Sequence, residues 1–211
     1  FIDPAADEVI EPDNTRLLSS TRLAAVSIER PVGAEPGGME DYSGPIFGQL
    51  QLEQLSHAAL VVVCSELAVQ VHLLIAGLLL SVAQRYGEAA AHAIGEFQMT
   101  GSCQVVSHRL SEWLGCKNSG IDGIIAVLHI HPAFQPREYS AVKLTRLDEN
   151  RALFEIRDCP AAEEGLPYGW FTLLARGMCG GLEGLVRGVD SRARIVRSDQ
   201  SSLAWEIIIG E

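Results

Sequence analysis

The fold is decided by residues 137–159, REYSAVKLTRLDENRALFEIRDC, where the periodicity of the chain changes. Apolar and polar residues alternate along this stretch, and the DEN at 148–150 is typical of a turn. The pattern predicts an antiparallel hairpin in which residues 137–147 pair with residues 151–158. The stretch separates a helical N-terminal half from a C-terminal half that contains strands.

The C-terminal half continues with a helical pattern over residues 169–190, GWFTLLARGMCGGLEGLVRGVD. Residues 192–200 and 201–211 then have the pattern of a second hairpin. The order ββ-α-ββ, after the helices, predicts an α+β fold. Its helical N-terminal half packs on an antiparallel sheet of about four strands.

Within the helical pattern of residues 169–190, glycines stand at 177, 180, 181, 184 and 188. Each glycine costs about 1 kcal/mol of helix propensity relative to alanine. We therefore expect another helix, a sheet or a ligand to pack very close to this segment.

Residues 50–86 read as one long helix that Gly87 ends. Its window 67–83, LAVQVHLLIAGLLLSVA, is apolar almost all round, although it carries Gln70 and His72. The window is shorter than the roughly 20 clean residues that a membrane span needs. We expect a helix that is buried on all sides or lies in a subunit interface, and no membrane span.

A second helix is expected over residues 88–116, broken near Gly101. Residues 120–132, GIDGIIAVLHIHP, fit either a helix or a strand, and Pro132 ends both. In a strand, His129 and His131 would point the same way, as metal ligands do. A helix would separate them, and the apolar stripe of Ile121, Ile124, Ile125 and Leu128 favours the helix, so we expect no metal site.

Composition limits the function. The 211 residues carry a formal net charge of -11, which disfavours nucleic acid and anionic membrane surfaces as partners. The five cysteines contain no C-x-x-C pair, so reduced thiols in a cytoplasmic protein are the simplest interpretation.

The proline-rich residues 1–46 are expected to form an extended arm or a linker, and residues 47–211 a single domain.

The run GGLEGLVRGVDSRARIVRSDQSSLAWEIII, residues 180–209, resembles the 4-vinyl reductase-like small-molecule-binding domains. It is also similar to the group around the 2-amino-thiazoline-4-carboxylate hydrolase-like proteins. The resemblance covers residues 50 to 211 and includes RYGEAAA at 85–91, Cys159-Pro160, and the Trp205-Glu206-Ile207 of the last strand. It implies a buried pocket between helices and sheet, used for sensing, for carrying a hydrophobic group or for assembly. The last hairpin lacks the cysteines common in that family, so its kind of metal site is not expected.

Cys159 stands where a strand is expected to end, and it is either a packing or ligand-lining thiol or a nucleophile. A nucleophile needs a base within hydrogen-bond reach, and the candidates are His108, His129 and His131, of which His131 is taken as the catalytic partner. The other residues expected to line or approach a ligand are His72, Trp170, Phe171, Cys179 and Gly180.

Two functions follow from these residues. The first is a binding or assembly module, a homodimer or a subunit of a larger assembly, that holds a hydrophobic or aromatic small molecule. The alternative is a thiol-dependent, hydrolase-like enzyme that acts on a small molecule through Cys159. No phosphate loop or dinucleotide-binding pattern is present in the sequence.

Overall fold

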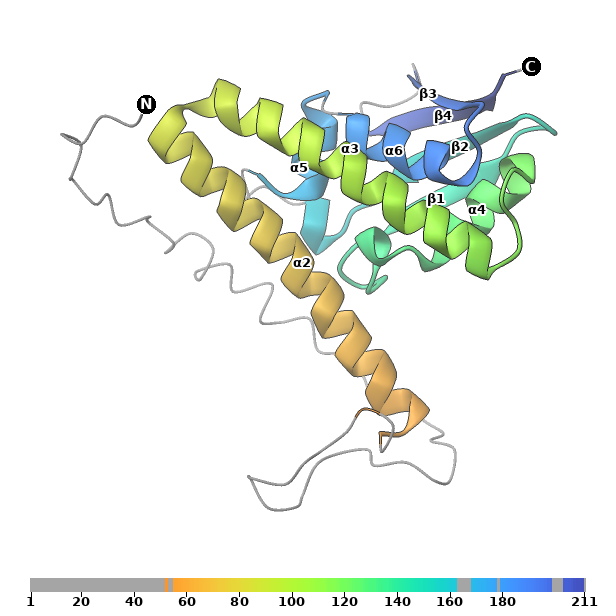
Figure 1. The fold of residues 1–211 in the computed structure, drawn as a ribbon, viewed down its shortest axis with the longest axis horizontal. Helices are drawn as coiled ribbons and strands as arrows, with labels where there is room; N and C mark the ends of the chain where they lie inside the picture. Colours follow the sequence, from red (N-terminus) through yellow and green to blue (C-terminus); the bar gives the residue numbers. More distant parts are fainter. Residues whose placement is uncertain (1–51, 53–54, 163–167, 178, 199–202, 211) are drawn as a thin grey trace.

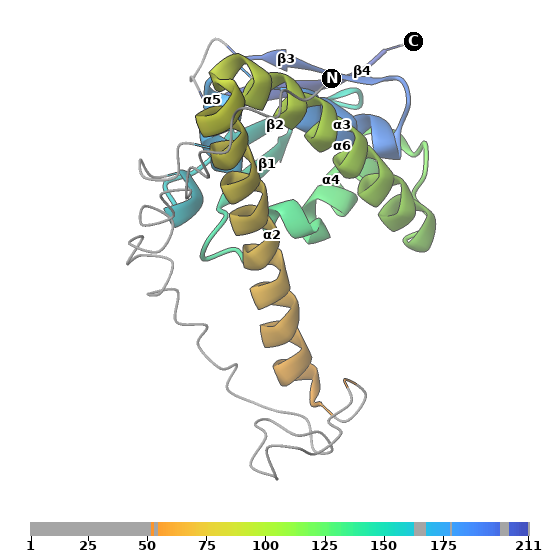
Figure 2. The same ribbon diagram turned by 60° about the vertical axis from the view of Figure 1, so that its left-hand side comes forward.

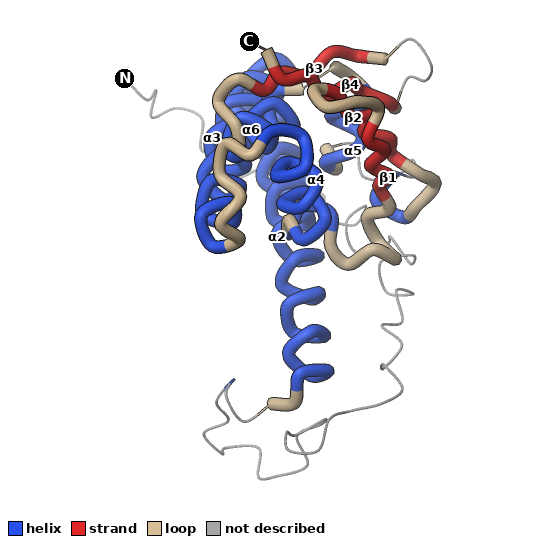
Figure 3. Tube along the Cα trace, turned by 90° about the vertical axis from the view of Figure 1, so that its right-hand side faces the viewer, coloured by secondary structure: helices blue, strands red, loops and turns tan. Residues whose placement is uncertain are grey.

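A computed structural model describes residues 52, 55–162, 168–177, 179–198 and 203–210. They form the predicted α+β fold, with the long helices first along the chain and a four-stranded sheet after them. Figure 3 shows α3, α4 and α6 on one side of that sheet. The arm or linker expected at residues 1–46 lies outside the described residues.

The sheet contains both predicted hairpins. Its strands are β1 (Val142–Arg146), β2 (Arg151–Ile156), β3 (Ala193–Arg197) and β4 (Ala204–Ile209). They lie in the order β1-β2-β4-β3, and all neighbours are antiparallel. β1 is shorter than predicted because the backbone N–H groups of Tyr139 and Ser140 donate to the carbonyl of Pro136, which closes a turn before the strand.

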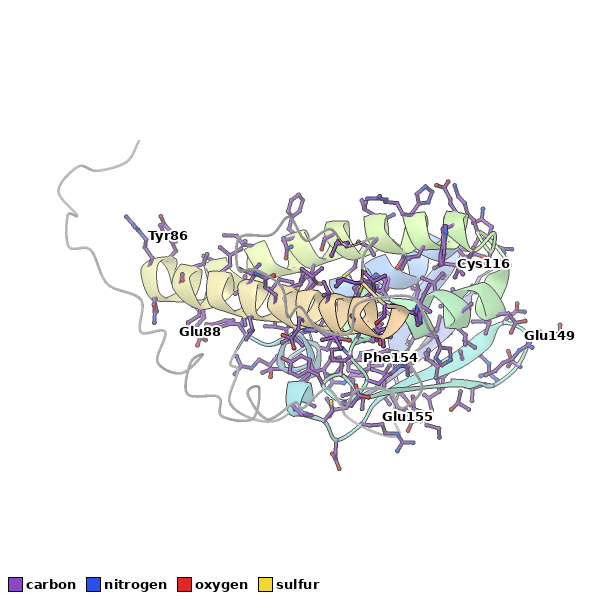
Figure 4. All side chains as sticks on the ribbon, turned by 90° about the horizontal axis from the view of Figure 1, so that it is seen from below. Tyr86, Glu88, Cys116, Glu149, Phe154 and Glu155 are labelled. Atoms are coloured by element: carbon purple, nitrogen blue, oxygen red, sulfur yellow. The ribbon has the colours of Figure 1, made fainter. Side chains whose placement is uncertain are left out.

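One face of the sheet is apolar and the other is polar, because successive side chains of a strand point to opposite faces. Phe154 is fully buried, and its ring centroid lies 6.0 Å from that of Trp205 on the neighbouring strand. Glu155 points to the other face, where its carboxylate lies 3.6 Å from the ammonium of Lys143. Figure 4 shows Phe154 on the side of the helices and Glu155 on the opposite side. The helices therefore cover the apolar face.

The helices in Figure 1 are α2 (His57–Tyr86), α3 (Glu88–Trp113), α4 (Gly120–Ile130), α5 (Trp170–Ala175) and α6 (Gly180–Val189). Two 3-10 helices, η2 (Pro132–Phe134) and η3 (Pro160–Ala162), complete the described elements. α4 confirms that residues 120–130 are helical. α2 begins later than predicted because Ser56 caps it, with its hydroxyl accepting a hydrogen bond from the N–H of Ala59 at 3.1 Å.

Two predictions about helix continuity were wrong. α3 runs unbroken through Gly101, since a single glycine weakens a helix without forcing it to end. The predicted helix over residues 169–190 is instead two helices. Gly177 has φ 93°, a left-handed conformation that ends helical winding, and Cys179 becomes the N-cap of α6.

The glycines of α6 face α3, which answers the expectation that something packs very close. A side chain at Gly184 would overlap the carbonyl oxygen of Thr100, and one at Gly188 would overlap that of Gln104. The two helix backbones therefore lie against each other with no side chain between them. α6 in turn contacts β3, so this helix pair is fixed to the sheet.

α2 corrects the prediction of a helix buried on all sides. Only one face is buried, through Ser65, Ala68, His72, Ala76 and Leu79, whereas the opposite face carries large exposed apolar residues. Figure 2 shows the reason, because α3, α4 and α6 occupy the centre and α2 reaches the fold from its flank. By length and composition alone, α2 is apolar enough to cross a membrane, and 17% of its most apolar 18-residue window is buried.

The contact between α3 and α6 gives a first prediction. Gly184→Ala should lower the free energy of unfolding by about 1–3 kcal/mol, because the new methyl group must push the helices apart. Gly101→Ala is the matched control, since nothing lies within 4 Å of its added methyl group. It should raise the free energy of unfolding by about 0.5–1 kcal/mol. Urea denaturation measures both, and a Gly184→Ala protein as stable as the wild type would contradict the packing described.

Candidate functional site

Buried polar and aromatic side chains gather where α2 meets η2 and α5. They come from elements far apart in the sequence, and none of them is more than 7% exposed. We call this group the His–aromatic cluster, and it consists of His72, His131, Phe134, Tyr139, Cys159, Trp170 and Phe171.

Phe134 is the centre of the cluster. Its ring centroid lies 6.1 Å from that of His131, 6.4 Å from that of Trp170 and 6.3 Å from that of Phe171. η2 places this ring, because Pro132 starts the 3-10 turn and the Nδ1 of His131 accepts a hydrogen bond from the N–H of Ala133 at 3.1 Å. The turn therefore fixes both the Phe134 ring and the orientation of the His131 imidazole.

Tyr139 connects His72 to Cys159. The His72 ring meets the Tyr139 ring edge-on, with centroids 5.3 Å apart. Burial, and secondarily the nearby Cys159 thiol, raises the pKa of Tyr139 to about 12. The N–H of Ala161 donates to the Tyr139 carbonyl at 3.0 Å, which holds the segment after β2 against the cluster. Because its pKa is raised, the Tyr139 phenol is a neutral group at physiological pH.

Both histidines of the cluster are neutral at pH 7. Burial lowers the pKa of His131 from 6.5 to about 4. Burial also lowers the pKa of His72 to about 4, against a smaller opposing effect of the Ala133 backbone. Because the Nδ1 of His131 accepts a hydrogen bond, its proton is assigned to Nε2. His131 thus offers a hydrogen-bond donor inside the cluster.

Three nitrogens of the cluster are buried without a hydrogen-bond partner: the Nε2 of His72, the Nε2 of His131 and the indole Nε1 of Trp170. An unsatisfied buried polar group costs about 1–3 kcal/mol. The cluster therefore holds unused hydrogen-bonding capacity, including two N–H donors, in surroundings that are otherwise aromatic.

The structure brings together five of the residues singled out from the sequence: His72, His131, Cys159, Trp170 and Phe171. Cys179 and Gly180 lie instead at the start of α6, where the N–H of Gly180 donates to the Glu96 carboxylate at 2.7 Å. The glycine-rich turn is thus occupied by a side chain of α3.

Sequence reasoning missed Phe134 and Tyr139. The alternation of residues 137–147 predicts a strand at Tyr139, and no sequence pattern singles out Phe134. Pro132 could have indicated a turn that points Phe134 inward, because proline is favoured at the first position of a helical turn.

His129 does not join the cluster. It is exposed, and its Nδ1 lies 2.8 Å from the guanidinium of Arg137. Among the described residues, no group of three or more His, Cys, Asp or Glu side chains could hold a metal ion.

No protein-family model matches this sequence, and no curated protein matches it. The resemblance to vinyl-reductase-like domains therefore stays a prediction.

The lowered pKa values predict how stability depends on pH. In the folded chain, His72 and His131 stay neutral down to about pH 4, whereas in the unfolded chain they take up protons below about pH 6.5. The free energy of unfolding should therefore fall as pH decreases from 6.5 towards 4. The loss between pH 7.5 and 5 should be roughly 2 kcal/mol for each histidine.

Urea denaturation at both pH values measures this loss. The loss of unfolding free energy that the two histidines cause should be about half as large in His72→Leu. His57 is exposed, and His57→Gln should leave the loss unchanged. Equal pH dependence in the wild type and His72→Leu would contradict the assignment.

Proposed function

We propose that this domain is a non-catalytic binding module whose ligand is a hydrophobic or aromatic small molecule that carries a hydrogen-bond acceptor. The observation that supports the proposal is the His–aromatic cluster, with its three buried nitrogens that have no partner. Native interiors satisfy the large majority of such groups. Three of the eight buried side-chain atoms without a partner in the described residues lie in this one aromatic cluster, as in a site that a ligand completes.

The chemistry of the cluster defines the ligand class. His131 Nε2–H and Trp170 Nε1–H are neutral donors, so they suit an uncharged acceptor such as a carbonyl oxygen. Phe134 and Phe171, with ring planes 22° apart, offer aromatic surface for the apolar part of the ligand. A charged ligand would lose its hydration without gaining an opposite charge in this cluster.

Ligand entry requires part of the cluster to open, because all of its side chains are buried. α2 contributes a single member, His72, and it contacts η2 and α5 at the edge of the fold. A displacement of α2 from η2 and α5 would therefore expose the cluster and leave the sheet in place, but it would also change the contact of α2 with α3.

The alternative function is a thiol-dependent enzyme with Cys159 as the nucleophile and His131 as the base. In the described part of the chain, no hydrogen bond joins Cys159 to a histidine. The Nδ1 of His131 is held by the N–H of Ala133, and the neighbour of Cys159 is the neutral Tyr139. The binding module is therefore the better supported of the two. All five cysteines are free, which supports a cytoplasmic location as part of this proposal.

Binding can be tested with prodan, a neutral aromatic ketone whose fluorescence reports the polarity of its surroundings. Trp170→Phe should weaken prodan binding about tenfold or more, because it removes one buried donor, and one hydrogen bond is worth about that much affinity.

Trp205→Phe is the matched control. Trp205 also has a buried indole N–H without a partner, but it lies on β4 outside the cluster. Its variant should bind prodan as tightly as the wild type. Equal weakening in both variants, or no binding by the wild type, would rule out the cluster as the site.

Thiol labelling separates the binding module from the enzyme. Iodoacetamide should react slowly with Cys159 in the native protein, because this thiol is 6% exposed and the structure gives it no activating base. The partly exposed Cys116 is the internal reference, and labelling in denaturant gives the unprotected rate. Labelling of native Cys159 faster than Cys116 near neutral pH would favour the thiol-dependent enzyme.

A further inference from the structure

The exposed face of α2 carries a regular apolar seam. Leu67, Val71, Leu74 and Leu78 are 52–63% exposed, although they are large apolar residues. Their spacing of four, three and four residues places them along one line of the helix, as in the a and d positions of a coiled coil. We call these four residues the α2 seam. The buried positions, such as Ser65, His72 and Leu79, lie on the other side of the helix.

The α2 seam lies in a stretch without charge. From Leu67 to Gln84 the helix contains no Asp, Glu, Lys or Arg, whereas the whole chain has a net charge of -11. Two copies of so acidic a protein repel each other, and this repulsion is weakest where their surfaces carry no charge. Polar residues beside the seam, Gln70 and Ser81, are also uncharged.

The first turns of α2 extend away from the body of the fold. In Figures 1, 2 and 3 this part of the helix projects beyond α3 and α4, and the buried positions of α2 begin only at Ser65. Val61 and Cys64 are exposed there. Most helices in proteins are stable because one apolar face packs against another element. We therefore expect the projecting apolar part of α2 to pack against a partner.

We infer that two copies of this chain pair through the α2 seam, with their α2 helices antiparallel. The seam is symmetric about its middle: in an antiparallel pair, Leu67 faces Leu78 of the other copy and Val71 faces Leu74. Such a self-complementary patch closes a two-fold dimer.

Electrostatics selects the antiparallel orientation. Each α2 is attached to its acidic body through its C-terminal half, so parallel helices would bring the two bodies together at one end. Parallel helices would also place Arg85 beside Arg85 of the other copy, at a position in line with the seam. The antiparallel pair separates the bodies and aligns the helix dipoles favourably. The projecting turns of each helix then pack along the attached half of the other.

This dimer does not depend on the proposed ligand. The seam and the His–aromatic cluster lie on different faces of α2, and neither the Trp170→Phe nor the Trp205→Phe variant changes the seam.

The test is the molar mass of the whole chain in detergent-free buffer, by size-exclusion chromatography with light scattering. The wild type should be a dimer, and Leu74→Glu should be a monomer with an unchanged far-ultraviolet circular dichroism spectrum, because Leu74 is exposed within each copy. Phe97→Glu is the matched control: Phe97 is 86% exposed, but it lies on α3, and its variant should remain a dimer. Labelling of Cys64 should be faster in Leu74→Glu than in the wild type.

Disulfide trapping tests the orientation. In the antiparallel pair Cys64 faces Ser81 of the other copy, so the Ser81→Cys variant should form an intermolecular disulfide on mild oxidation, between Cys64 of one copy and the introduced thiol of the other. The wild type should form no Cys64–Cys64 disulfide, and peptide mass spectrometry identifies the linked residues.

A monomeric wild type, or a dimer that survives Leu74→Glu, would overturn the interface, and a Cys64–Cys64 link would overturn its orientation. Partition of the wild type into phosphatidylcholine vesicles would show that lipid covers the seam, and would equally overturn the proposal.

Discussion

The direct contact between the backbones of α3 and α6 is the constraint on which the rest of this structure depends. Gly184 and Gly188 let α6 lie against the carbonyl groups of Thr100 and Gln104, and a side chain at either position would have to push the two helices apart. Because α6 also contacts β3, the pair fixes a two-layer body in which helices cover one face of the sheet. Because α3, α4 and α6 already cover that face, α2 packs at the edge of the body instead of over the sheet.

The flank position gives α2 two different surfaces. Its buried face holds the small residues Ser65, Ala68 and Ala76, the large Leu79, and His72, whose ring meets that of Tyr139 in the cluster. The α2 seam lies on its other face and is exposed. The proposed ligand site and the proposed dimer therefore share one helix, and any displacement of α2 that admits a ligand would have to be compatible with the partner helix. If both proposals hold, a single helix connects binding to assembly.

The His–aromatic cluster combines buried polar atoms without a partner and two histidines with strongly lowered pKa values in one place. Elsewhere the described core is mainly aliphatic and aromatic, although five further buried polar atoms, among them the Nε2 of His92 and the indole Nε1 of Trp205, also have no partner. Here three buried nitrogens have no partner, and two histidines are held neutral far from their ordinary pKa. Such local conflicts with stability are expected at functional sites, where a ligand supplies what the protein lacks. Cys159 is 6% exposed in this cluster, and burial of this kind disfavours the thiolate that a nucleophile needs.

The sequence by itself determined the elements whose signal is local. Alternation in residues 137–159 predicted the first hairpin, the stripe from Ile121 to Leu128 predicted α4, and the glycines of residues 177–188 predicted a close neighbour. Only the tertiary structure decided that this neighbour is α3, that Gly177 divides the C-terminal helix, and that His72 meets Tyr139. It also decided that α2 is covered on one face alone. The physical reason is that periodicity shows which face of an element is apolar, whereas what covers that face depends on segments distant in the chain.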